Sequence, residues 1–170
     1  AGCTIEDTTG DPDNPIYERA IAIERIAAAA EVVRGLDRPF MLTARAENYL
    51  FNRPDFEDTL MRLQCFEMVG ADVLYAPALP DLEAIRIVCK EVSKPVNVVA
   101  GIGLPGVTIA ELEAAGVRRI SVGSAFARIA YGAMINAAQE IFDTGSFAPF
   151  KRAASFASIE ALIKSSDLKP

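Results

Sequence analysis

The chain of 170 residues, 51% of them apolar, is long enough to bury one substantial core and matches the usual size of a single domain. Its 23 acidic residues outnumber 17 basic ones, without a long run of one sign, which argues against a nucleic-acid or anionic-membrane surface. The absence of histidine excludes Ser-His and Cys-His catalytic pairs and His-ligated zinc. Carboxylates, Arg, Lys, Tyr, Cys or a hard metal ion remain for any chemistry.

Short β-rich runs alternate with helical stretches along the chain, and the helical stretches tend to end in Gly or Pro signals. We expect strands at about residues 2–6, 40–45, 72–76, 95–100 and 119–123. We expect helices at about residues 16–35, 55–69, 80–92, 108–115 and 124–143. This order predicts a parallel α/β sheet with right-handed crossovers in residues 1–150, followed by a helical tail at 151–170.

The strand runs MLTA, DVLYA, VNVVA and RISVG are almost continuously apolar, so we expect these strands to be buried on both faces. The helix at 16–35 has an amphipathic pattern. Its buried side is expected to carry Ile16, Ala20, Ile23, Ile26, Ala27 and Ala30.

The cysteines and the hydropathy point to a compartment. Cys3, Cys65 and Cys89 lie far apart without a CxxC spacing, which favours buried free thiols over a disulfide or a zinc set. No stretch reaches the roughly 18 apolar residues of a membrane span, and no signal-peptide pattern is present. We therefore predict a cytoplasmic protein that contacts neither a membrane nor nucleic acid.

Parallel α/β folds place their ligands at the carboxyl ends of the strands, whether the sheet is open or closed as a barrel. Polar and glycine-rich residues follow each expected strand, as a site at a barrel mouth requires. They are Glu6, Asp7, Arg45, Glu47, Asn48, Pro77, Asn97, Gly101, Gly103, Gly123 and Ser124.

Two acidic residues end the first strand. Neighbours on a strand point to opposite faces, so only one of Glu6 and Asp7 can face a barrel interior, and Glu6 is favoured. A carboxylate at this place is a candidate metal ligand or acid/base group, and a helix cap or an ion-pair partner is the alternative.

Arg45 and Glu47 are two residues apart and should share a face. A guanidinium at the mouth could hold an anionic substrate in bidentate fashion while the carboxylate orients it. A structural ion pair between the two is the alternative, because charges in a strand run are costly unless they are paired or used.

Glycine-rich turns follow the last two strands. Gly123 and Ser124 open a helix whose free backbone N–H groups could receive a phosphate, phosphonate or carboxylate. A tight turn that binds nothing is the alternative for each glycine patch. The segment TTGDPDNP, at 8–15, predicts a turn-rich loop that could serve as a lid.

Several motifs in this order, GCTIEDTTGDPDNPIYE, LTARAENYL, GADVLYAPALPDLEAI, KPVNVVAG and GVRRISVGSAFARIAYGA, resemble the isocitrate lyase/phosphoenolpyruvate mutase superfamily. The branch that the chain resembles most is the carboxyphosphonoenolpyruvate phosphonomutase-like one. The resemblance covers nearly the whole chain and implies a TIM (β/α)₈ barrel. The IED strand matches the fourth strand of that barrel, so the chain corresponds to the last five β/α units.

The resemblance implies a Mg²⁺-dependent enzyme, with Mn²⁺ as an alternative, that acts on small α-keto or 2-hydroxy carboxylic acids. It would cleave or form C–C or P–C bonds through an enolate-like intermediate. Glu6 matches the acidic residue that helps to hold the metal, and Arg45 matches the arginine that grips a substrate carboxylate or phosphonate. Asn97, Gly123 and Ser124 correspond to substrate-binding segments, and Glu47 beside Arg45 is the second catalytic candidate.

The resemblance also implies assembly into a homo-oligomer, a dimer or tetramer, with the tail at 151–170 packed on a neighbouring subunit. The proton donor is left open between Tyr49, Tyr75 and a water. An aldolase- or isomerase-like barrel using Gly101 and Gly123 as its anion site is one alternative function. A non-catalytic half-barrel subunit that pairs through its open sheet edges is another.

The chain departs from the superfamily pattern in three ways. It lacks the aspartate pair that the early strands contribute to the metal shell. TTGDPDNP replaces the Lys-Cys-Gly-His type lid of the lyases, and Ala78 follows Pro77 where the lyases have a glutamate. Isocitrate lyase activity is therefore not expected.

Overall fold

The computed structural model describes residues 1–101 and 104–165, without the side chain of residue 165. The described chain forms two compact units that divide after Gly123. We predicted the boundary between residues 150 and 151, later in the chain than this division, and the assignment of 1–150 to one barrel stays a prediction.

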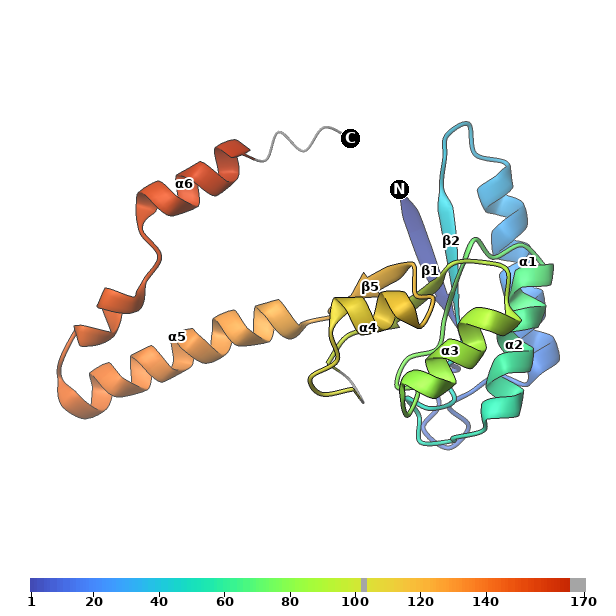
Figure 1. Ribbon diagram of the computed structural model, residues 1–170, viewed down its shortest axis with the longest axis horizontal. Helices are drawn as coiled ribbons and strands as arrows, with labels where there is room; N and C mark the ends of the chain where they lie inside the picture. The colour runs from blue at the N-terminus through green and yellow to red at the C-terminus, as the bar shows by residue number, and fades with distance from the viewer. Residues whose placement is uncertain (102–103, 166–170) are drawn as a thin grey trace. The chain divides into compact units, whose positions relative to one another are not determined.

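The first unit alternates strands and helices as predicted (Figure 1). Its strands are β1 (Gly2–Glu6), β2 (Met41–Arg45), β3 (Val73–Tyr75), β4 (Val96–Val99) and β5 (Arg119–Ser121). Its helices are α1 (Arg19–Arg34), α2 (Phe56–Met68), α3 (Leu82–Glu91) and α4 (Ile109–Ala114). All neighbouring strands are parallel and follow one another in chain order, β1-β2-β3-β4-β5.

Three of these helices begin at side chains that cap their first turn. Asp55 and Asp81 accept backbone N–H groups three residues further on, at 2.9 and 2.8 Å, before α2 and α3. Thr108 and Glu111 form a reciprocal capping box at the start of α4. Local sequence therefore determines where the crossover helices start.

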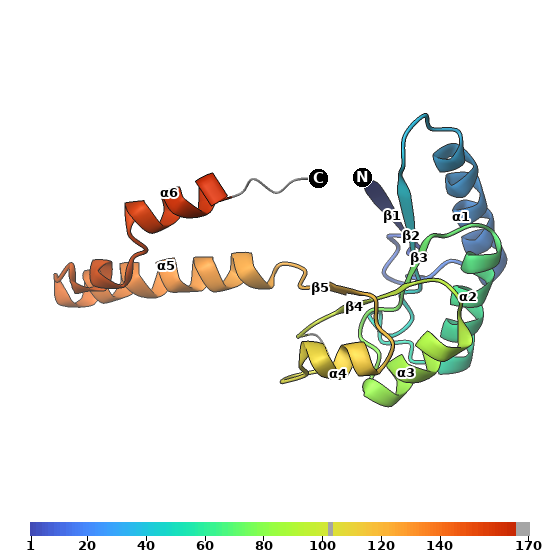
Figure 2. The same cartoon turned by 45° about the horizontal axis from the view of Figure 1, so that its top comes forward.

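The helices cover one face of the sheet, and Figure 2 shows α1, α2 and α3 on one side of the strands. Alternate residues of the inner strands point into this helical layer and form a continuous core. Its members include Leu42, Ala44, Leu74, Val96 and Val98 from the strands and Ile26, Leu63, Phe66, Ile85, Val88 and Leu112 from the helices.

The expectation that the four apolar strand runs are buried on both faces is wrong for β5, which lies at a sheet edge. All four residues of β4 are buried, but Arg119 and Ile120 of β5 are exposed. On β1, Gly2, Cys3 and Thr4 are exposed as well. An edge strand has one neighbour, and the helices of this unit cover only one face.

The buried side of α1 differs in detail from the predicted one. Ala22, Ile26 and Ala30 are buried at a spacing of four residues, whereas Ala20 is exposed. Ile16 precedes the helix and forms an antiparallel bridge with Thr8 instead. The helix starts at Arg19, later than expected, so Ile16 does not belong to its buried side, whereas Ile26 and Ala30 do and Ile23 packs against the core.

The three cysteines are free thiols, as predicted, but their burial is not as predicted. Cys3 is exposed on the edge strand, and Cys65 and Cys89 are only partly buried.

The second unit is helical, with α5 (Ala125–Thr144), the 3-10 helix η1 (Ala148–Arg152) and α6 (Phe156–Ser165). Gly145 ends α5 in the left-handed conformation at a φ of 66°. No residue of α5 is buried in the described structure. Across the described residues, no helix combines the length and apolar character needed to cross a bilayer.

Candidate active site

One row of side chains crosses the whole sheet. The register pairs Glu6 with Arg45, Arg45 with Tyr75, Tyr75 with Asn97, and Asn97 with Arg119. Residues paired in this way lie on the same face, and that face is the one opposite the helical layer. The fold thus brings together Glu6, Arg45 and Asn97, which the sequence placed at separate strand ends.

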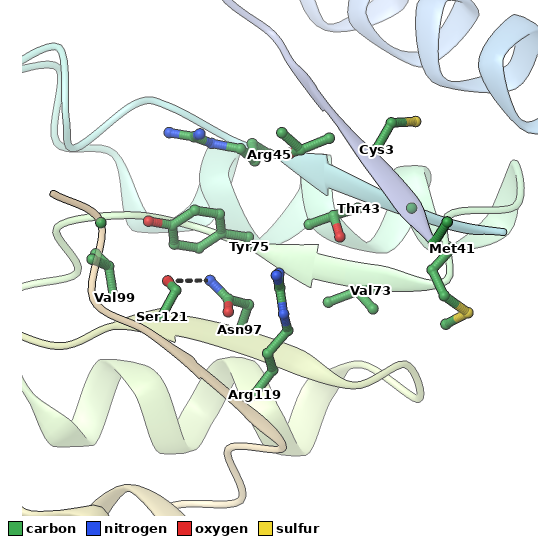
Figure 3. Close-up of a pocket in the computed structure, with 14 residues that line it drawn as sticks. Cys3, Met41, Thr43, Arg45, Val73, Tyr75, Asn97, Val99, Arg119 and Ser121 are labelled. Atoms are coloured by element: carbon green, nitrogen blue, oxygen red, sulfur yellow. Dashed lines mark hydrogen bonds between the residues drawn. The ribbon is translucent and has the colours of Figure 1, made fainter. Parts of the chain in front are cut away.

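The row runs obliquely across the sheet. Glu6, Arg45 and Tyr75 are the last residues of their strands, whereas Asn97 is the second residue of β4 and Arg119 the first of β5. A cavity of about 710 Å³ follows this face (Figure 3). Its lining includes Arg45, Tyr75, Asn97, Arg119, Ser121 and Gly123.

Arg45 is held by two carboxylates. Its Nη1 lies 2.6 Å from Glu6 Oε1, and its Nε donates to Glu47 Oε1 at 2.5 Å. Its guanidinium also lies 4.8 Å from the centre of the Tyr75 ring. The structural ion pair between Arg45 and Glu47, one of two alternatives at the sequence level, is present, and its cation borders the cavity.

Glu47 lies two residues after the end of β2 and is 1% exposed. Burial raises the pKa of its carboxyl to about 7, while Arg45 opposes that rise and the nearby charges of Glu6 and Asp7 add to it. A carboxyl with this pKa can hold or release a proton near neutral pH.

Asp7 faces the helical layer, on the opposite side from Glu6, as the alternation predicts. It is 1% exposed, and its Oδ1 accepts the backbone N–H of Glu47 at 2.9 Å. Its Oδ2 lies 3.2 Å from Nη1 of Arg62, a residue of α2. Asp7 therefore links the segment that carries Glu47 to the helical layer.

Sequence reasoning missed Arg62. Its Nε also donates to Asp58 Oδ2 at 2.6 Å, and its Nη1 donates to the carbonyl of Tyr17 at 2.9 Å. One signal was available, because Arg62 lies among the core-facing positions of its helix next to Leu63. A charged residue at such a position requires a buried partner.

The amide of Asn97 is buried in the cavity wall. Its Nδ2 donates to Ser121 Oγ at 3.1 Å. Its Oδ1 is buried without a hydrogen-bond partner among the described residues. Ser121 and Arg119 were also missed, although their alternate positions on the last predicted strand place them on one face.

The two tyrosines considered as proton donors lie in different places. Tyr75 lines the cavity, and Tyr49 packs beside Phe56 and Pro80 in a separate hollow. Burial raises the pKa of both phenols, so both stay protonated at neutral pH. The geometry therefore favours Tyr75 over Tyr49.

The glycine-rich turns do not form one cluster. Gly123, at a φ of 52°, lines the cavity, and Gly101 has a φ of 88° at the turn after β4. Gly103 lies outside the described residues. Ser124 belongs to the second unit, where it precedes α5 without a side-chain cap, so its predicted role stays a prediction.

The loop at 8–15 is internally hydrogen-bonded. Thr9 Oγ1 donates to the carbonyl of Asn14 at 2.5 Å and accepts the N–H of Asp11 at 2.9 Å. The N–H of Asp13 then donates to Asp11 Oδ1 at 2.9 Å. These bonds are those of a turn-rich loop, and a function as a lid stays a prediction.

The described residues do not by themselves fit a Mg²⁺ site. Glu6 is the one predicted ligand, and its Oε1 is taken up by the Arg45 guanidinium. Nowhere in residues 1–101 and 104–165 do three carboxylate, Cys or His side chains gather closely enough to hold a metal ion. A dication next to Arg45 would also be repelled by its charge.

Comparison with known proteins gives consistent matches. The family model of phosphoenolpyruvate phosphomutase matches residues 1–142. The structure superposes on a candidate lyase/mutase from Burkholderia cenocepacia J2315 with a TM-score of 0.91 and 46% identity, over 98% of this chain and 60% of that one. An uncharacterized protein of Mycobacterium tuberculosis is 29% identical over 125 residues, which are 73% of this chain and 45% of that protein.

A 2,3-dimethylmalate lyase, a member of the PEP mutase/isocitrate lyase superfamily, has the same fold, with a TM-score of 0.78 and 20% identity. The match covers 98% of this chain and 57% of that one. These neighbours are TIM barrels, and this chain spans about three-fifths of their length. The predicted fold class, part of a (β/α)₈ barrel of this type, is confirmed.

Proposed function

Because the chain belongs to the phosphoenolpyruvate phosphomutase family, we propose that it carries part of the active site of a lyase or phosphonomutase-like enzyme. The proposed substrates are small α-keto or 2-hydroxy carboxylic acids, and the reaction cleaves or forms a C–C or P–C bond. The proposal depends on one observation: the guanidinium of Arg45 is held by Glu6 and Glu47 at the border of the cavity.

Arg45 would bind the carboxylate or phosphonate of the substrate. Nε and Nη1 are occupied by the two glutamates, which fixes the orientation of the guanidinium and leaves Nη2 for an anion. When the bond next to the carbonyl breaks, negative charge spreads onto an enolate-like intermediate. A cation fixed in advance stabilises that charge without reorganising.

Glu47 and Tyr75 would handle protons. Glu47, with a pKa of about 7, can exist in both protonation states at neutral pH, as a general acid or base requires. Tyr75 remains a neutral phenol at the cavity and can donate a hydrogen bond or a proton to the intermediate.

A Mg²⁺ or Mn²⁺ requirement is part of the proposal for the longer enzyme. Glu6 would provide one ligand of a metal shell, and residues outside this chain would complete it. The chain alone should then bind Mg²⁺ weakly, with a dissociation constant in the millimolar range or above. Isothermal titration of the chain with MgCl₂ measures this directly.

We also propose that the protein is cytoplasmic and forms a homo-oligomer. The free thiols support a reducing compartment. Exposed apolar side chains along α5, among them Phe126, Ile129 and Met134, support self-association. Light scattering of the chain, and of a version cut before Ala153, tests the assembly. If both proteins are monomeric, the proposed homo-oligomer is contradicted.

Turnover assays with Mg²⁺ and oxaloacetate or 2-alkylmalates test the function. The chain would be compared with a version extended at its N-terminus by the three β/α units that complete an eight-stranded barrel. We expect activity in the extended form, lost in Arg45→Ala and kept in Arg38→Ala, which removes an exposed arginine. A folded extended form without turnover would instead favour a non-catalytic assembly subunit.

A further inference from the structure

Arg119 is a cation on the same face as Arg45, and the proposed function gives it no role. It occupies the far end of the polar row, three strands from Arg45, and it lines the same cavity. Figure 3 shows its side chain passing beside Asn97 toward β3. No ion pair or hydrogen bond of its guanidinium is formed within the described part of the first unit.

The preceding residue, Arg118, provides an internal comparison. It does not line the cavity. Burial raises the pKa of the Cys89 thiol on α3, and the charge of Arg118 partly opposes that rise. The two arginines therefore serve opposite sides of the sheet. Of these two neighbours, Arg119 is the one that lines the cavity.

Asn97 is the register partner of Arg119, and its Oδ1 is a second, independent sign of a ligand. The side chain is 1% exposed, its Nδ2 is bonded to Ser121, and its Oδ1 has no partner among the described residues. A buried acceptor without a donor is uncommon in native proteins and costs free energy until a donor reaches it. A ligand hydroxyl in the cavity would supply that donor.

We propose that Arg119 and Asn97 form a second subsite that binds the 2-hydroxycarboxylate end of a substrate, with the carboxylate on Arg119 and the hydroxyl donating to Asn97 Oδ1. Neighbouring strands are about 4.8 Å apart, so Arg45 and Arg119 start roughly 14 Å apart along the row. The Arg45 guanidinium lies 4.8 Å from the centre of the Tyr75 ring on β3, and Figure 3 shows Arg119 extending toward β3, so the two side chains reach toward each other and a short-chain diacid would bridge them. This inference rests on the proposed function, because it uses Arg45 as the first anion site.

Three ligands separate the parts of the subsite: malate, succinate, which lacks the hydroxyl, and lactate, which lacks the second carboxylate. Binding to the 170-residue chain would be measured by isothermal titration, with circular dichroism to verify folding. We expect the chain to bind malate about tenfold more tightly than succinate, as one satisfied hydrogen bond predicts. Lactate, with one carboxylate, should bind more weakly than malate.

The variants then locate each contact. Arg119→Gln should weaken malate binding about tenfold or more, and Arg118→Gln, the matched control, should leave malate binding unchanged. Asn97→Leu should remove the preference for malate over succinate while leaving succinate binding unchanged. Equal effects of the two arginine variants, or a malate preference that persists in Asn97→Leu, would overturn the subsite.

Arg45→Gln separates this inference from the proposed function. Loss of malate binding in Arg45→Gln but not in Arg119→Gln would leave the function standing and refute the subsite. Loss in Arg119→Gln but not in Arg45→Gln would support the subsite and contradict the role proposed for Arg45. A wild-type chain that is folded but binds none of the three ligands would overturn the subsite, whereas the proposed function is tested separately by turnover in the extended form.

Discussion

Replacing Arg62 by methionine should destabilise the first unit more than any surface substitution. Arg62 is 7% exposed, and its guanidinium contacts Asp7, Asp58 and the carbonyl of Tyr17. Methionine keeps much of the apolar volume of the arginine stem but none of its donors. The change therefore isolates the charge and hydrogen bonds from the packing.

The magnitude follows from what is left behind. Asp58 retains Arg19 and Asn48 as partners, so losing the contact between Asp58 and Arg62 costs little stability. Asp7 stays buried with the N–H of Glu47 but without a countercharge. Breaking such a buried pair costs about 3–5 kcal/mol, which for a chain of this size lowers Tm by roughly 6–20 °C.

Urea denaturation followed by circular dichroism measures the loss, and Arg86→Met is the control. Arg86 forms an exposed ion pair with Glu83 on α3, so its replacement should cost less than about 1 kcal/mol. Arg62 lowers the pKa of Asp7, which burial already raises. Without Arg62 that pKa rises further, so the deficit relative to wild type should shrink as the pH falls and Asp7 takes up a proton.

Two results would refute this reasoning. A cost for Arg62→Met below about 1 kcal/mol, equal to that of Arg86→Met, would mean that the buried pair adds no net stability. A deficit that does not shrink at acidic pH would mean that an uncompensated Asp7 charge is not its cause.

Three further stability predictions use the same denaturation assay. Wild-type stability should fall as pH rises from about 4.5, the ordinary pKa of Glu47 in the unfolded chain, to about 7, its pKa in the fold. Glu47→Gln should remove the part of this fall that Glu47 causes, on the order of 3 kcal/mol. A wild-type profile parallel to that of the variant would contradict this. Leu63→Ala, at a fully buried site, should cost about 2–5 kcal/mol, and Met68→Ala, 83% exposed, less than about 0.5. Thr108→Ala should cost about 1 kcal/mol by removing the cap of α4, and an unchanged Tm would refute it.

The order of strands and helices was predictable from local signals. Apolar runs indicated the parallel strands. The expected helix starts at residues 55, 80 and 108 lie close to the caps Asp55, Asp81 and Thr108 that the structure shows. The start of α1 was not predictable in the same way. Ile16 was counted as helical, but its bridge to Thr8 depends on a contact across the loop, which no helical periodicity records.

The site was predictable only where its partners are close in sequence. Arg45 and Glu47 are two residues apart, and strand alternation alone placed them on one face. Asp7 and Arg62 are distant in sequence, and only the packing of α2 against the end of β1 brings them together. The unpartnered Oδ1 of Asn97 was likewise invisible, because an absent contact has no sequence signature.

Side chains along the strands point alternately to the helical core and to the cavity, so substitutions on the two faces have different effects. Leu42, Ala44 and Leu74 belong to the core under the helices, so substitutions there change the packing that stabilises the fold. Thr43 and Val73, their neighbours along the same strands, line the cavity instead. A lineage can therefore retune what this face recognises, one strand position at a time, while the scaffold that carries it is inherited unchanged.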